Sequence, residues 1–155
     1  MKGKIVAGLL LFMLVSCGQN KNESQSFYYG FTNNSWETGQ TVSFPFGVSD
    51  TTLHYNVHGK LRYTNSFTFS TLDMSVSLLT PSGSSRFRKI HLRMTSNDGE
   101  KVGNSVDDYL EIPFDVYDSV RFAETGEWVL KFNHNMPVDI NRGIVGMEIF
   151  IDSKK

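Results

Sequence analysis

Histidines are the side chains in this sequence best suited to hold a metal ion. The chain has four of them, and His54 and His58 are four positions apart. The alternation of apolar and polar residues around them predicts a strand, on which the two rings lie roughly 13 Å apart at about 3.3 Å per residue. One ion cannot be shared over that distance, so no metal site is expected and the histidines are interpreted as surface or half-buried residues.

Carboxylates are the second candidates for chemistry. A glycosidase needs two carboxylates that face each other across a cleft. Glu111 and Asp115 share one outward face of a predicted strand instead, and Asp107, Asp108 and Asp118 flank that strand. A hydrolase is therefore the last-ranked hypothesis, and the acidic residues are interpreted as a solvated edge.

Calcium ligands and nucleophiles give weaker signals. Asn97, Asp98, Glu100 and Asn104 offer oxygen ligands in one loop, but their spacing does not follow an ordered ligand pattern. The sequence has no Gly-x-Ser-x-Gly motif and no glycine-rich phosphate loop. We expect neither a catalytic residue nor a cofactor, and the protein is predicted not to be an enzyme.

Basic residues gather in one short segment. On a strand, Arg86 and Arg88 share one face, and Lys89, His91 and Arg93 share the other. A solvated face explains such a pattern, and a partner surface is the alternative. Arg86 and Arg88 are therefore candidate partner-binding residues.

Aromatic side chains on loops or strand edges can stack on sugars or anchor a protein partner. Trp36 lies among several aromatic residues at the start of the domain, and Phe67 and Phe69 flank a stretch resembling a turn. These three residues are candidate ligand-binding positions, although most aromatic residues in a domain of this size must be core.

Composition limits the function classes. The 155 residues are 39% hydrophobic, 13% aromatic and 20% charged, which is typical of one globular domain. The net charge of −1 argues against a nucleic-acid partner. The single cysteine excludes an internal disulfide.

The N-terminus predicts export and lipidation. Residues 1–16 have a basic start and an uncharged apolar run, as in a secretory signal peptide. Leu14-Val15-Ser16-Cys17 resembles the lipobox of bacterial lipoproteins, in which the cysteine is acylated, for example with palmitate, and becomes the new N-terminus. Residues 17–26 are expected to be the acylated Cys17 and a flexible tether, since Gly18 to Ser26 contain no hydrophobic residue.

The remainder, residues 27–152, is predicted to be a single all-β domain. Apolar and polar residues alternate with a period of two in seven segments: Val42–Val48, Leu53–Tyr63, Asp73–Leu78, Lys89–Met94, Tyr109–Val116, Trp128–Asn133 and Val145–Asp152. Seven or eight antiparallel strands predict a β-sandwich, jelly-roll-like in topology, with a small closed barrel as the alternative.

Two details of this domain are predicted separately. Pro45 and Pro113 lie inside strand patterns, so their strands are expected at sheet edges or with bulges. Asp118 to Glu124 fits one helical turn or another strand.

Spaced landmarks extend over most of the chain. They include Phe31 and Trp36, then Val42-Ser-Phe-Pro-Phe46, Tyr55-Asn56-Val57, Leu61-Arg62-Tyr63, Gly126-Glu-Trp128, His134-Asn-Met136, Ile140 and Ile144-Val-Gly146-Met-Glu-Ile149. With the lipobox, this pattern resembles the gliding motility lipoprotein family GldH of Bacteroidetes. Two departures are Asp98–Gly103, where the family often has a Trp, and Pro137, where it tends to have Arg.

The resemblance implies a non-catalytic envelope lipoprotein associated with the gliding machinery and the linked type IX secretion apparatus. Its partners would be the membrane, through Cys17, and envelope proteins of that machinery. A glycan- or peptide-binding sandwich of the outer membrane is the alternative. The tether contains one Lys and one Glu and no dense acidic run, which favours an outer-membrane anchor with the domain facing the periplasm.

Overall fold

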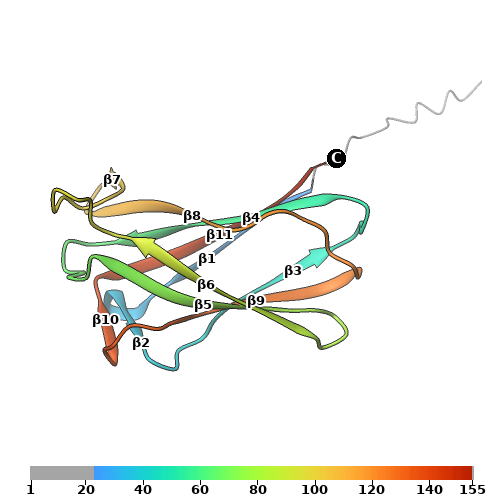
Figure 1. The fold of residues 1–155 in the computed structure, drawn as a ribbon, viewed down its shortest axis with the longest axis horizontal. Helices are drawn as coiled ribbons and strands as arrows, with labels where there is room; N and C mark the ends of the chain where they lie inside the picture. The colour runs from blue at the N-terminus through green and yellow to red at the C-terminus, as the bar shows by residue number, and fades with distance from the viewer. Residues whose placement is uncertain (1–22, 155) are drawn as a thin grey trace, which may run out of the picture.

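The computed structural model describes residues 23–154, which form eleven strands and one short 3₁₀ turn (Figure 1). The elements are β1 (Ser24–Gly30), η1 (Thr32–Asn34), β2 (Ser35–Glu37), β3 (Val42–Val48), β4 (His54–Tyr63), β5 (Thr71–Leu79), β6 (Ser85–Arg93), β7 (Asn104–Val106), β8 (Tyr109–Val120), β9 (Gly126–His134), β10 (Ile140–Arg142) and β11 (Ile144–Lys154). The predicted signal peptide and Cys17 lie outside the described residues.

Two antiparallel sheets form the body of the domain. One has the strand order β1-β11-β4-β8-β7, the other has the order β3-β9-β5-β6, and β2 pairs with β10 in a separate two-stranded sheet. Apart from the short β2, β7 and β10, consecutive strands change sheet except at the β5–β6 hairpin. This order is a jelly roll built from two Greek keys. The predicted all-β sandwich is therefore confirmed, and the sheet does not close on itself.

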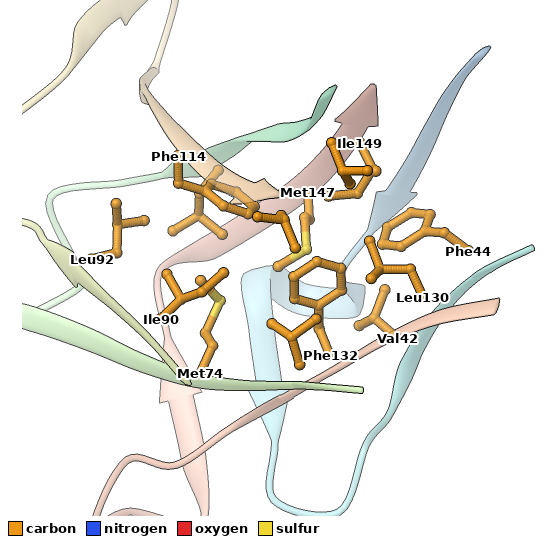
Figure 2. Packing of buried hydrophobic residues seen from close by; sticks show 14 of the residues in the cluster. Val42, Phe44, Met74, Ile90, Leu92, Phe114, Leu130, Phe132, Met147 and Ile149 are labelled. Atoms are coloured by element: carbon orange, nitrogen blue, oxygen red, sulfur yellow. The ribbon is translucent and has the colours of Figure 1, made fainter. Parts of the chain in front are cut away.

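The core fills the space between the two sheets, and alternation along the strands produces it. In β3 the burial pattern is strictly alternating, so Val42 and Phe44 point inward while the residues between them are exposed. Side chains from both sheets point toward one another there, including Phe132 of β9, Phe114 of β8 and Met147 of β11 (Figure 2). Burial of this apolar surface, at about 25 cal/mol per Å², is the main stabilising contribution to the fold.

The strand patterns read from sequence correspond to β3, β4, β5, β6, β8, β9 and β11. The short strands and β1 were not predicted. β1 starts at Ser24, inside the segment expected to be a tether, and none of its residues is fully buried. The uncertain stretch from Asp118 begins as strand, because β8 continues to Val120.

Both prolines lie where a strand lacks a neighbour. Pro45 is in β3, an edge strand of its sheet. Pro113 is in β8 beyond Glu111, the last residue that pairs with β7. A missing N–H is tolerated at both places, as predicted.

The described chain enters and leaves the sandwich at one end, called the terminal end here. Glu23 and Ser153 bond each other there, with Ser153 N donating to Glu23 O at 2.8 Å. β2, β7 and β10 lie at the far end (Figure 1). Within residues 23–154, no helix has the length and apolar character needed to span a bilayer.

Candidate interaction surfaces

A network of charged and aromatic side chains covers the outer face of the five-stranded sheet; we call it the Arg62 network. Arg62 of β4 donates from Nε to Glu111 Oε2 of β8 and from Nη2 to Glu148 Oε2 of β11, both at 3.1 Å. Its guanidinium also lies over the Tyr28 ring at 5.0 Å and the Tyr109 ring at 5.6 Å. One cation therefore ties four strands together.

The Arg62 network shifts the protonation of its members. Burial alone would raise the pKa of the Glu111 carboxyl, but hydrogen bonds from Lys60 and Arg62 outweigh it and hold that pKa below its usual range. Burial would lower the pKa of Arg62, but the bond to Glu111 and nearby groups raise it overall. Both side chains are therefore charged at neutral pH, and the surface they form is preorganised.

The histidines lie apart from one another. His58 Nε2 is 2.9 Å from Asp152 Oδ2, and His91 Nδ1 is 2.8 Å from Asp73 Oδ1. His134 is buried, which lowers its pKa despite opposing backbone hydrogen bonds. Across residues 23–154, the His, Cys, Asp and Glu side chains form no group of three placed to hold a metal ion.

The acidic candidates are distributed over two regions. Asp107 and Asp108 line a hollow of about 290 Å³ at the far end, while Asp115 and Asp118 line another of about 260 Å³ beside His58. Glu111 belongs to the Arg62 network and faces Lys60 Nζ at 3.0 Å.

The loop with the candidate calcium ligands, residues 97–104, is hydrogen-bonded to β6 through Asn97. Asn97 Oδ1 accepts a hydrogen bond from Arg93, so one of the four oxygen candidates is engaged by a cation. Glu100 contributes its backbone, since its N–H donates to Ser96 Oγ at 3.2 Å. These bonds close the turn between β6 and β7.

The basic candidates lie on β6, at the edge of the four-stranded sheet. Arg88 points toward β8, where it donates to Val116 O and lies over the Tyr117 ring at 5.0 Å. Burial raises the pKa of Tyr117, and the charges of Arg88 and Arg86 oppose that rise. Phe87, between the two arginines, is 77% exposed, the most exposed large apolar side chain of the described residues.

Two of the aromatic candidates are not on the surface. Trp36 and Phe67 are both 0% exposed, and Phe69 is half-buried with its ring 5.8 Å from that of Phe67. Trp36 packs on Phe31 and donates from Nε1 to Gln40 O at 2.9 Å. The structure corrects their expected placement: large rings between strands are core, and sequence alone does not separate a loop at the surface from one folded inward.

A polar groove of about 500 Å³ lies at the far end, over the β2–β10 sheet. It is lined by hydroxyl, amide, charged and apolar side chains: Thr32, Asn33, Ser35, Glu37, Gln40, Ile140 and Arg142. Gln40 links the groove to β1, because its Nε2 donates to Tyr29 Oη at 2.9 Å. The sequence reading did not find this groove.

The Arg62 network was also missed as a unit. Its signal in the sequence is the outward alternation of Lys60 with Arg62 and the acids Glu111 and Glu148. Only the strand order brings these residues onto neighbouring strands.

Some of the solved structures with a likeness to this fold are viral proteins. The infectious bursal disease virus VP2 subviral particle gives a TM-score of 0.41 at 14% identity, covering 84% of this chain and 32% of that chain. The Gx strain of the same virus gives 0.36 at 11% identity, covering 97% and 44%. The chain spans less than half of these proteins, and at such scores the likeness has no bearing on function.

Sequence comparison is more specific. The family model described as GldH lipoprotein matches residues 24–149. The gliding motility lipoprotein GldH of Flavobacterium johnsoniae is 29% identical over 118 residues, covering 76% of this chain and 70% of that protein. The matched region contains nearly the whole sandwich, so the chain belongs to the GldH lipoprotein family, as its landmark residues predicted.

Proposed function

We propose that this protein is a non-catalytic assembly component of the bacterial envelope, associated with gliding motility and type IX secretion. Acylation of Cys17 would anchor it to the outer membrane with the sandwich in the periplasm. Membership of the GldH lipoprotein family is the observation that carries the proposal. The relative in Flavobacterium johnsoniae is named for gliding motility, which gives the process.

The arrangement of charges supports a binding role over a catalytic one. The Arg62 network, the His58–Asp152 pair and the His91–Asp73 pair each join neighbouring strands on an outward sheet face. Such pairs satisfy each other and fix a rigid surface. Acid–base catalysis instead requires groups directed at a common substrate position.

Crosslinking in the native envelope tests the proposal. The full chain, tagged at its C-terminus and with Cys17 intact, is crosslinked in its host and purified, and the attached proteins are identified by mass spectrometry. Gliding or type IX secretion proteins should be enriched over a similarly tagged, unrelated outer-membrane lipoprotein. Recovery of neither class in repeated experiments would refute the assembly role.

The far-end groove favours a glycan- or peptide-binding module as the second candidate. Its amide, hydroxyl and charged side chains are the groups that hydrogen-bond sugars or peptide backbones. A ligand of the native state must raise the melting temperature of the domain. Screening cell-wall saccharides and peptides by thermal shift should then find a ligand whose effect is lost in Arg142→Ala. Stabilisation that persists in Arg142→Ala would place the ligand elsewhere.

A further inference from the structure

Within residues 23–154, no strand pairs with the outer edge of β6, whereas parts of the edges of β3 and β8 are blocked. On the opposite side of the sandwich, Gln25 of β1 hydrogen-bonds the outer edge of β3. Gln25 Nε2 donates to Gly47 O at 2.7 Å, and Gly47 N donates to Gln25 Oε1 at 3.0 Å. Pro45 removes another donor from that edge. The outer edge of β8 is covered by β7 as far as Glu111, and Pro113 follows.

Register identifies which backbone groups of β6 face outward. Thr80 N donates to Ser84 O at 2.8 Å before the strand, and Met94 N donates to Ser70 O at 2.8 Å after it. Residues that bond the partner strand alternate with residues that do not. Because Ser84 and Met94 bond β5, the even-numbered residues of β6 direct their backbone N–H and C=O groups toward β5. The odd-numbered residues, including Phe87 and Lys89, direct theirs to the open edge.

The side chains at this edge are basic around one apolar residue. Arg86, Arg88 and Lys89 form no ion pair with any acid of the described residues. Phe87, 77% exposed, shares the outer face of β6 with Lys89, whereas Arg86 and Arg88 lie on the face toward the other sheet, where Arg88 donates to Val116 O. Burial of such a ring contributes about 1.5–3 kcal/mol when a partner covers it, and unpaired cations attract a partner of opposite charge.

These charges also decide against a second copy of this chain as the occupant. Pairing two β6 edges antiparallel would bring the basic side chains of both copies together, and opposed like charges are destabilising. Lysine and inward-pointing charges on an edge are known devices against self-association. An acidic strand is instead attracted by these basic residues. The same side chains therefore attract an acidic partner and repel a second copy of this chain.

We propose that the β6 edge binds an extended acidic segment of a partner protein by strand addition. The segment adds to the four-stranded sheet through backbone hydrogen bonds at Phe87 and Lys89, places an apolar side chain on Phe87, and pairs its carboxylates with the basic residues. This inference rests on the proposed assembly role and names the surface and the chemistry of the partner.

Photocrosslinking at Phe87 tests the proposal in the full, Cys17-intact chain in its native envelope. A benzophenone amino acid replaces Phe87, and the matched control carries it at Ser43, on the outer face of the other edge strand of the same sheet. A protein adduct specific to position 87 is expected, and its mapped peptide should be rich in Asp and Glu. An adduct with a second copy, an adduct with lipid alone, or equal yields at both positions would overturn the proposal.

Two substitutions at Lys89 distinguish the contribution of its charge to partner binding from that of its backbone N–H. In the same crosslinking assay, Lys89→Glu should lower the adduct yield at position 87 by about tenfold or more, since it reverses an interface charge. Lys89→Pro removes an outward N–H without touching the bonds to β5, and about a fivefold to tenfold loss is expected. If Lys89→Pro lowers the melting temperature markedly, Lys89→Glu alone decides. Unchanged yields in Lys89→Glu would overturn the proposal.

Failure of this inference and failure of the assembly role are distinguishable. Enrichment of gliding or secretion proteins on the tagged chain, without a position-87 adduct, would support the assembly role and refute strand addition at the β6 edge. A position-87 adduct with an acidic segment of an unrelated protein would support the edge and refute the assembly role.

Discussion

Arg62 and Glu111 face each other as register partners in the β4–β8 pair, with Nε donating to Oε2 at 3.1 Å. Both side chains are largely shielded from water, at 25% and 14% side-chain exposure. Charged hydrogen bonds in such surroundings are among the stronger ones. Removing one partner leaves the other charge shielded from water and without its counterion.

Arg62→Ala should therefore destabilise the domain by about 1–3 kcal/mol, because Glu111 and Glu148 both lose the cation they share. Denaturant unfolding of the two proteins measures the difference. Arg142→Ala is the control, since this side chain is exposed and should change stability by about 0.5 kcal/mol or less. Equal effects of the two substitutions would contradict the importance of the Arg62 network.

The Glu111 carboxyl predicts an acid sensitivity with a defined sign. Its pKa is below 4.5 in the folded protein and ordinary in the unfolded chain, so its contribution is complete above pH 4.5. The contribution falls as the pH drops from there through the folded pKa. Glu111→Gln should be less stable than the parent at pH 7, and the gap should narrow toward pH 3. A gap that is constant over this range in urea unfolding would contradict the assignment.

Gly59 predicts a packing defect. A Cβ there would lie 2.9 Å from Glu148 O and closer still to the Phe114 ring, which is the register partner of Gly59. Gly59→Ala should destabilise by about 1–3 kcal/mol through overpacking. Adding Phe114→Leu should make the glycine substitution less costly in a double-mutant cycle. Independent, additive effects would show that the ring is not the obstacle.

Trp36 and Phe87 form a contrasting pair of aromatic residues. Trp36 is fully buried, so Trp36→Ala should cost about 3–5 kcal/mol, whereas the exposed Phe87→Ala should leave stability nearly unchanged. Thermal and denaturant unfolding measure both. A stable, well-folded Trp36→Ala protein would contradict the core position of this ring.

Cys17→Ala tests the anchor separately from the fold. The variant should lose labelling by a metabolically supplied fatty-acid analogue and move from the membrane to the soluble periplasmic fraction. Its melting temperature, measured on the purified domain, should match the parent. Retention of the fatty-acid label by the variant would refute acylation at Cys17.

Strand positions were predictable because one face of each long strand is buried, so apolar and polar residues alternate along its sequence with a period of two. Thus Val42, Phe44 and Phe46 alternate with polar or small residues and lie in the core. β1 escaped prediction because its inward residues Phe27 and Tyr29 are only partly buried and Tyr28 faces outward. A half-covered edge strand has little contrast between its faces.

The surfaces were less predictable, because they depend on which strands become neighbours. Arg62, Glu111 and Glu148 are far apart in sequence and meet only through the jelly-roll order. Arg86 and Arg88 were found from local alternation, but the openness of their edge is a property of the whole sheet. Phe67 was misplaced because a short turn-like stretch gives no indication that its ring folds inward.

The contact between Glu23 and Ser153, at the two ends of the described segment, has a consequence for the distance from the membrane. The segment between Cys17 and Glu23 extends at most about 20 Å, so an acylated Cys17 keeps the terminal end near the bilayer. β11, with 11 residues, reaches roughly 35 Å from there toward the far end. The groove over β2 and β10 would then face away from the bilayer, while β6 runs along the height of the domain. A partner that approaches from far above the bilayer and one that lies along the membrane would contact different surfaces of the same small protein.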